Sequence, residues 1–360
     1  MQNKTYELSL VKTYVSHWGI LEAIRELIQN ALDSDSPFVY DFKTDERGFS
    51  ELILNSEYSV LTPQTLLLGS TSKGAGDAIG SFGEGYKIAL LVLTRFGIPV
   101  EILNGSVKWT PMFKFNEHFG EELLVIEETP IEGNTNKGLT FRVKGLTEDD
   151  VEAIKESCLR MQDNIGAIKQ TKYGDILLDK PRQLYVGGLF VCETDTEYGY
   201  NVIPKYLRLE RDRQTVDGWD LSMLTKDMWF DTKDYDMIAE LMEADIVDLR
   251  RAEWGCPELV KEACYKRFRE KNPDAIIANN NDEVQELVER GLTVYVGGNV
   301  FASAVQSSDN YEAEGNNYKE VLTPNQIMVQ FFKDNKSEMR TKALVAFKKV
   351  LSQSNQWKIK

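Results

Sequence analysis

The sequence predicts an α+β protein, and three patterns support this prediction. Residues 16–35 place Leu21, Ile24 and Ile28 at the spacing of an amphipathic helix. The segment 136–146 alternates apolar and polar residues, as half-buried strands do, and the segment 51–63 is also predicted to be a strand. The glycine-containing run IGSFGEGYK at 79–87 leads directly into an apolar helical segment. Helices and strands of comparable length in one chain predict the α+β class.

The polar face of the helix at 16–35 is a candidate site. Ser16 is the expected N-cap. Glu26, Asn30 and Asp33 stand at positions i, i+4 and i+7, so at about 100° per residue they fall within roughly 60° of one another. One stripe then holds a potential general base, an amide oxygen for a cation and a third polar group. Taken alone, such a stripe is also typical of a solvated helix face.

The glycine run provides a second candidate. Gly80, Gly83 and Gly85 precede the apolar segment, so a flexible backbone delivers N–H groups at a helix N-terminus. Such a terminus attracts phosphate. A tight loop before a core helix would look similar, and only the combination with the upstream helix favours a nucleotide site.

The length, net charge and residue counts of the chain exclude several kinds of function. The chain has 360 residues, enough for two or three domains, and a net charge of -15, which disfavours a broad nucleic-acid surface. No apolar stretch reaches the length that spans a bilayer, so a soluble, cytoplasmic protein is expected. The two histidines are isolated, so any hydrolysis is expected to depend on carboxylates. The four cysteines lack CxxC spacing and predict free thiols: Cys158, Cys192, Cys256 and Cys264.

These motifs together resemble the GHKL superfamily, the group of gyrase B, the ninety-kilodalton heat-shock chaperone, sensor histidine kinases and MutL. IRELIQNALDSD at 24–35 resembles the family's N-box, and IGSFGEGYKIALLV at 79–92 resembles its glycine box. LGSTSKGAGDAIG at 68–80 is similar to a MutL-type lid. The resemblance covers about residues 10 to 145. It implies a Bergerat-type fold, with a mixed sheet covered by helices, and a site for ATP and Mg²⁺.

The resemblance also implies roles for single residues. Glu26 would be the general base, and Asn30 would bind Mg²⁺, which prefers oxygen ligands and keeps several waters. Ser72 and Lys73 would lie near the phosphates. The complete set of expected nucleotide contacts in these two motifs and the lid is Asn30, Asp33, Ser72, Lys73, Gly80, Phe82, Gly83, Glu84, Gly85 and Lys87.

One family element is missing. In the family, the Asp-x-Gly-x-Gly motif that recognises adenine follows the strand after the N-box helix, but here the strand at 51–63 offers Asn55, Ser56 and Glu57 without glycines. Asn55 or Glu57 could bond the base edge, although a backbone without glycine approaches a base less closely. The strand at 136–146 is similar to the family's late Gly-Thr strand, and its Thr140 stands one position away from where the family has its threonine.

Three domains are expected. Residues 1–148 would bind ATP, 149–300 would form a transducer-like α+β domain, and 301–360 would form a loop and a helical C-terminal segment. A second domain of this family sends a basic residue to the γ-phosphate, and Arg211 is the candidate, with Arg213 as the alternative. A charged surface turn would explain the same residues.

The expected function is Mg²⁺-dependent ATP hydrolysis that drives a conformational or dimerisation switch acting on a protein partner. A nucleotide-dependent homodimer is expected, with no nucleic-acid or membrane partner. The alternative is a catalytically silent interaction or inhibitor module that binds nucleotide weakly or not at all. The compact size and the missing motif also resemble stand-alone GHKL proteins of bacteriophages and bacteria.

Overall fold

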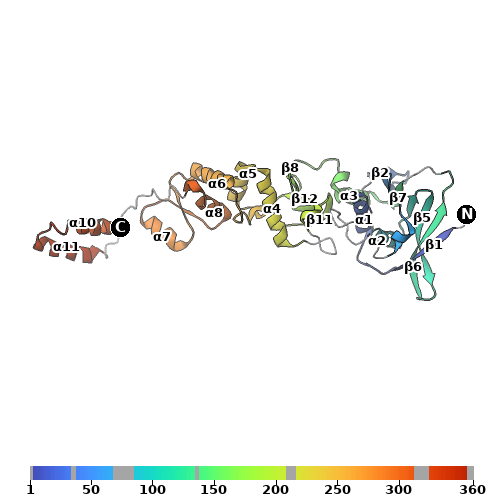
Figure 1. Cartoon of the computed structure of the whole chain (residues 1–360), viewed down its shortest axis with the longest axis horizontal. Helices are drawn as coiled ribbons and strands as arrows, with labels where there is room; N and C mark the ends of the chain where they lie inside the picture. Colours follow the sequence, from blue (N-terminus) through green and yellow to red (C-terminus); the bar gives the residue numbers. More distant parts are fainter. Residues whose placement is uncertain are drawn as a thin grey trace. The chain divides into compact units, whose positions relative to one another are not determined.

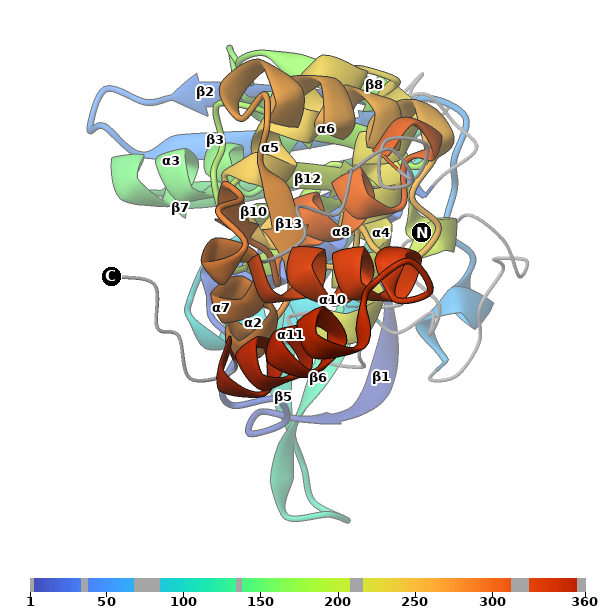
Figure 2. The ribbon, with the colours of Figure 1, turned by 90° about the vertical axis from the view of Figure 1, so that its left-hand side faces the viewer.

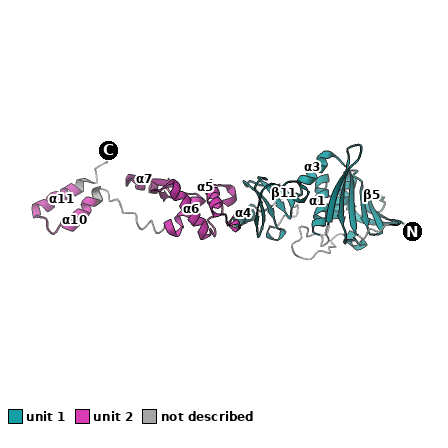
Figure 3. Cartoon of the chain, turned by 90° about the horizontal axis from the view of Figure 1, so that it is seen from above, with its two compact units in different colours: residues 1–228 teal, residues 229–360 magenta. Residues whose placement is uncertain are grey.

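The computed structural model describes residues 3–33, 38–67, 85–133, 138–207, 216–311 and 324–354. The chain divides into two compact units, residues 1–228 and 229–360, and the division falls inside helix α4, Gly218–Thr232 (Figure 3). Helices and strands occur in both units, which confirms the predicted α+β class. The finer domain boundaries at residues 148 and 300 stay predictions.

The main sheet of the first unit has seven strands in the order β1-β6-β5-β4-β7-β3-β2. All six pairings are antiparallel, so this sheet is not the mixed sheet that the resemblance implied. The β5–β6 hairpin extends beyond the other strands (Figure 2). The strands are β1 Lys4–Val11, β2 Phe38–Thr44, β3 Ser50–Ser56, β4 Val100–Asn104, β5 Val107–Asn116, β6 Glu121–Pro130 and β7 Leu139–Leu146.

Three helices cover one face of this sheet: α1 Ile20–Leu32, α2 Gly85–Arg95 and α3 Glu148–Glu156 (Figure 1). Leu52 and Leu54 of β3 pack in one hydrophobic cluster with Ile24 and Leu27 of α1. The alternate residues Leu139, Phe141 and Val143 of β7 join the same cluster, which confirms the alternation predicted for this strand. The core of the first unit therefore lies between the helices and this face.

The start of α1 differs from the prediction. Gly19, not Ser16, is the N-cap, and the helix begins at Ile20. The backbone N–H of Gly19 donates to Glu22 Oε2 at 2.9 Å, so a side chain from inside the first turn caps the helix. Ser16 lies in a turn that contains Val15 at a φ of 46°, a backbone that cannot enter a helix.

A second, five-stranded sheet follows in the same unit, in the order β11-β10-β12-β9-β8. Only β10 and β12 pair in parallel. β10 and β11 form a hairpin, and its turn uses Gly187 and Gly188 at φ values of 59° and 82°. The strands are β8 Ile168–Thr171, β9 Gly174–Leu177, β10 Gln183–Val186, β11 Leu189–Glu193 and β12 Gly199–Val202.

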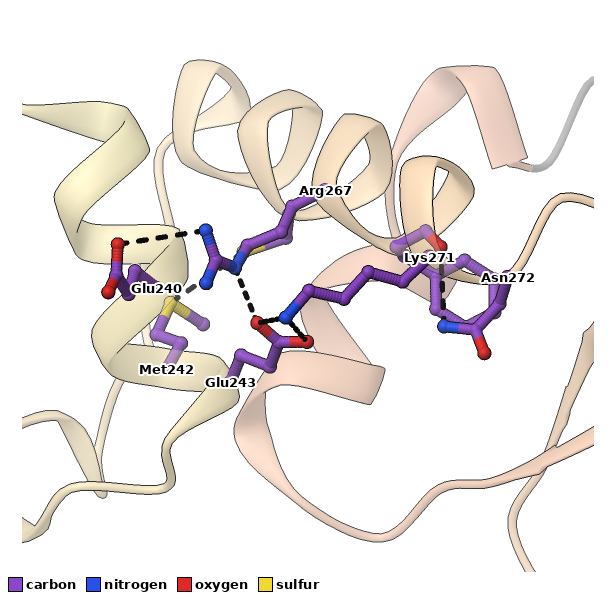
Figure 4. Close-up of polar contacts among 8 residues, drawn as sticks. Glu240, Met242, Glu243, Arg267, Lys271 and Asn272 are labelled. Carbon is purple, nitrogen blue, oxygen red and sulfur yellow. Dashed lines mark hydrogen bonds and ion pairs between the residues drawn. The ribbon is translucent and has the colours of Figure 1, made fainter.

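The second unit is mainly helical. Its elements are α5 Tyr235–Glu243, α6 Glu258–Lys271, β13 Ile276–Ala278, α7 Asn281–Glu289, β14 Val294–Val296, α8 Val300–Gln306, α10 Pro324–Asn335 and α11 Thr341–Ser354. Glu243 joins α5 to α6 by accepting hydrogen bonds from Arg267 and, at 2.7 Å, from Lys271 (Figure 4). Burial raises the pKa of Glu243, but these two donors outweigh burial and hold the pKa below its ordinary value.

No helix within the described ranges is long and apolar enough to cross a membrane. All four cysteines are free thiols, as predicted, and those of Cys158 and Cys264 are buried. Burial raises the pKa of both buried thiols, which keeps them protonated and unreactive.

Candidate nucleotide site

The site is built on the polar side of α1. One side of this helix is buried in the core through Ala23, Ile24 and Leu27. Glu26 lies on the neighbouring side, yet it is only 6% exposed. A buried carboxylate is costly unless positive charge or donors surround it, so its surroundings indicate its role.

The N-terminus of α2 supplies those surroundings. α1 and α2 pack against each other, and Gly85 is the first residue of α2. A Cβ atom added at Gly85 would lie 1.9 Å from Glu26 Oε2 and 3.6 Å from Asn30 Nδ2. Only glycine permits this approach without moving the carboxylate. The first turn of α2, where the helix dipole is positive, therefore lies directly against Glu26.

Asn30 stands one turn after Glu26 and is half-buried. Its Nδ2 atom donates to the backbone oxygen of Glu26 at 2.6 Å, which orients the side chain along α1. Asp33 is the C-cap of α1, and its backbone N–H donates to Gln29 at 2.9 Å. The structure thus brings Glu26, Asn30 and Gly85 together, with Asp33 at the end of the same helix.

The first turn of α2 is fastened to the 3₁₀ helix η1, Pro63–Leu66. The Tyr86 hydroxyl donates to the backbone oxygen of Thr65 at 2.8 Å. The ammonium of Lys87, which is fully buried, donates to the backbone oxygen of Leu67. Lys87 thus has a structural contact here, and its predicted contact with phosphate stays a prediction. Burial raises the pKa of Tyr86 to about 12, so its hydroxyl remains a donor.

β3 places the predicted base contact Asn55 on the face of the sheet turned away from α1. Ser50, Leu52, Leu54 and Ser56 alternate as its buried residues, and the two leucines face α1. Asn55 therefore points to the opposite face. There it pairs in register with Thr140, whose hydroxyl donates to Asn55 Oδ1 at 3.0 Å. The structure brings Asn55 and Thr140 to each other, but not to the face of the sheet that α1 covers.

Ser56 was missed as a candidate. It shares the face of Leu52 and Leu54, is 6% exposed, and ends β3. The period of two along the strand predicts this face, so the sequence contained the signal. Glu57 follows as an exposed residue. Gly138 lies against this strand end, because a Cβ atom there would be 2.5 Å from the backbone oxygen of Ser56.

Seven predicted site residues lie outside the described part of the chain. They are Ser72, Lys73, Gly80, Phe82, Gly83, Glu84 and Arg211, together with the alternative Arg213. Their roles stay predictions. Leu67 and Gly85, which stand directly before and after residues 68–84, are described. They lie at the ends of η1 and α2, the two elements that the hydrogen bonds of Tyr86 and Lys87 connect.

No protein-family model matches the sequence. An uncharacterized protein of Mycoplasma pneumoniae is 22% identical over 219 residues, which cover 57% of this chain and 89% of that protein. Among solved structures, the B subunit of the DNA gyrase from Myxococcus xanthus matches with a TM-score of 0.32 and 9% identity, over 60% of this chain and 90% of that chain. A TM-score of this size does not establish a shared fold.

Proposed function

We propose that the chain binds ATP with Mg²⁺ beside Glu26 and hydrolyses it. The observation that supports this most is the contact between Gly85 and Glu26, in which a Cβ atom would come within 1.9 Å of the carboxylate. The two sequence motifs, about fifty residues apart in the chain, meet at this point. A helix N-terminus, a buried carboxylate and an amide side chain then line one place, as binding and cleavage of a phosphoanhydride require.

Each residue of the proposed site has a separate role in hydrolysis. Glu26 orients the attacking water and accepts its proton. Asn30 would hold Mg²⁺ together with the nucleotide phosphates, and this donor set suits a cation that prefers oxygen ligands and keeps waters. When bound, the cation would supply positive charge that neutralises the phosphates. Backbone N–H groups of the segment that ends at Gly85 hold the phosphates, and Arg211 completes the site.

The base lies on the α1 side of the sheet in this proposal, near Ser56 instead of Asn55. Ser56 ends the strand on that face, and its hydroxyl can donate or accept a hydrogen bond. Turnover then drives a conformational or dimerisation switch that acts on a protein partner.

A second candidate function has one specific observation in its favour. Asn55, the nearest substitute for the missing adenine-binding aspartate, is bonded to Thr140 on the sheet face turned away from α1. A descendant of an ATPase that has lost base recognition could serve as an interaction module without turnover. The buried Glu26 opposes this candidate, because a binding-only module has no need of a costly buried carboxylate.

Single-turnover hydrolysis tests the proposed function. Labelled ATP with Mg²⁺ is mixed with excess protein, and phosphate release is followed for the wild type, Glu26→Ala and Glu46→Ala. Glu46 is an exposed residue of the β2–β3 turn and serves as the matched loss of one carboxylate. We expect Glu26→Ala to lower the rate by about 10²- to 10⁴-fold, the usual contribution of a general base, and Glu46→Ala to leave it unchanged. Equal rates in all three proteins would contradict the role of Glu26, and no release from the wild type would favour the second candidate.

A further inference from the structure

Arg25 connects the helix of the candidate site to the second sheet. This half-buried residue directly precedes Glu26 on α1, and its Nη2 atom donates to the backbone oxygen of Phe190 in β11. The two residues are far apart in the sequence, but α1 and β11 are neighbours in the first unit (Figure 1). The helix that carries the proposed base is therefore bonded to the second sheet one residue before that base.

β11 offers an acceptor because it is an edge strand. It is the outermost strand of the five-stranded sheet and pairs with β10 on its inner side. In an extended strand the N–H and C=O of one residue point to the same side, so Phe190 presents both groups at the outer edge. Its N–H donates to the backbone oxygen of Ser157, the C-cap of α3, at 2.9 Å, and its oxygen accepts from Arg25. One residue of β11 thus joins α3 to α1.

Further contacts fix the start of β11. The N–H of Leu159 donates to the backbone oxygen of Gly188 at 2.9 Å, and Cys158 forms a β-bridge with Leu189. Leu189 is 3% exposed and belongs to the same hydrophobic core as the apolar side of α1. The carbonyl group of Phe190 is therefore a fixed point to which Arg25 is attached.

Arg25 and Glu26 cannot move independently, because they are consecutive residues of one helix. Hydrophobic packing is non-directional and resists rotation of α1 less sharply than a directional, charge-assisted hydrogen bond does. Side-chain ends lie about 5 to 6 Å from a helix axis, so a rotation of about 10° moves them by about 1 Å. A misplacement of this size can slow a reaction about 10²-fold.

We propose that Arg25 is a positioning residue, which fixes the rotation of α1 through β11 and thereby holds Glu26 against the first turn of α2. The role builds on the proposed function, because it acts through Glu26. Loss of the bond slows hydrolysis more than it weakens nucleotide binding. Proton transfer requires the base within hydrogen-bond reach, whereas Mg²⁺ keeps several waters that accommodate a small shift of Asn30.

Single-turnover hydrolysis and calorimetric ATP binding, each with Mg²⁺, test the role in the wild type, Arg25→Met and Arg182→Met. Arg182 is the matched control, because its Nε atom donates to the backbone oxygen of Thr194 at 3.1 Å, at the other end of the β10–β11 hairpin. We expect Arg25→Met to lower the rate about 10- to 10²-fold and the affinity less than about threefold, and Arg182→Met to change neither. Arg25→Lys keeps the charge and most of the stem, and this milder variant should lower the rate at least threefold. Wild-type rates in both Arg25 variants, or a loss of affinity as large as the loss of rate, would overturn the role.

Urea denaturation without nucleotide tests the positioning separately from hydrolysis. Gly85→Ala places a Cβ atom 1.9 Å from Glu26 Oε2 when α1 is held in place. In Arg25→Met the released helix can move the carboxylate away, so Gly85→Ala should lower the urea midpoint less than half as much as it does in the wild type. Equal shifts in the two backgrounds would show that Arg25 does not hold Glu26 at Gly85. Unequal shifts in a chain that releases no phosphate would contradict the proposed function and still support the attachment of α1 through Arg25.

Discussion

At the scale of single residues, Gly85 and Glu26 depend on each other. Gly85→Ala inserts a Cβ atom 1.9 Å from Glu26 Oε2, so the buried carboxylate must shift. We expect a loss of about 1 to 3 kcal/mol in the free energy of unfolding, as for other overpacked sites. Urea denaturation measures this loss. In a Glu26→Ala background the added methyl group meets no carboxylate, and its cost should fall below about 1 kcal/mol. An equal cost in both backgrounds would show that the two residues do not interact.

The raised pKa of Tyr86 predicts that the folded protein loses stability at alkaline pH. Burial raises its pKa to about 12, whereas an unfolded tyrosine titrates near 10, so between these values the folded state holds the proton more firmly. Stability should therefore fall as the pH rises from about 10 to 12, by about 2 to 3 kcal/mol for a shift of two pKa units. In Tyr86→Phe this part of the loss should disappear, at a cost near neutral pH of about 1 kcal/mol for the lost hydrogen bond. Urea midpoints at pH 8 and 11 measure both effects, and an unchanged pH dependence in Tyr86→Phe would contradict the assignment.

At the scale of elements, β3 distinguishes the two sides of the main sheet. Ser56 shares the α1 face, whereas Asn55 bonds to Thr140 on the other face. A nucleotide held beside Glu26 should therefore depend on Ser56. We expect Ser56→Val to lower ATP affinity at least fivefold and Asn55→Ala to lower it less than twofold, as measured by calorimetry. The reverse order would place the base on the Asn55 side and would favour the role first predicted for that residue.

The same strand shows what the sequence predicts and where it falls short. The strand predicted at 51–63 is confirmed only as far as Ser56, where β3 ends, and residues 57–62 form a turn and a loop. The family motif drew attention to Asn55 because of its amide, although the period of two already assigns Ser56 to the face of α1. The partner of Asn55 comes from β7, some eighty-five residues later in the chain, and a local pattern cannot reveal such a pairing.

Helix ends illustrate the same limit. Thr147 caps α3, because Asp150 and Thr147 exchange hydrogen bonds within four residues. Ser16 was wrong as the cap of α1. The preceding backbone turns through a left-handed Val15, and Glu22 caps the helix from inside. Both caps use residues only three apart, so separation along the chain does not distinguish them; at α1 the preceding turn overrides the propensity of serine.

At the scale of the whole molecule, the contact between two motifs distant in sequence could be predicted only through the family resemblance. No pattern in residues 16–35 or 79–87 alone requires Glu26 and Gly85 to meet. Their contact arises because α1 and α2 pack together on one face of the sheet. The sequence also did not predict which residues complete the hydrophobic core of the first unit. Three of them lie beyond residue 148: Cys158, Met161 and Leu189.

Calorimetric titration of ATP with Mg²⁺ into the full chain tests the central claim most directly. We predict binding to the wild type, binding of similar affinity to Glu26→Ala, and binding weakened at least tenfold in Asn30→Ala. Such a result would assign cation-dependent nucleotide binding to the place where α1 meets α2. Absence of binding to a folded wild type, or an affinity of Asn30→Ala for ATP with Mg²⁺ equal to that of the wild type, would contradict it.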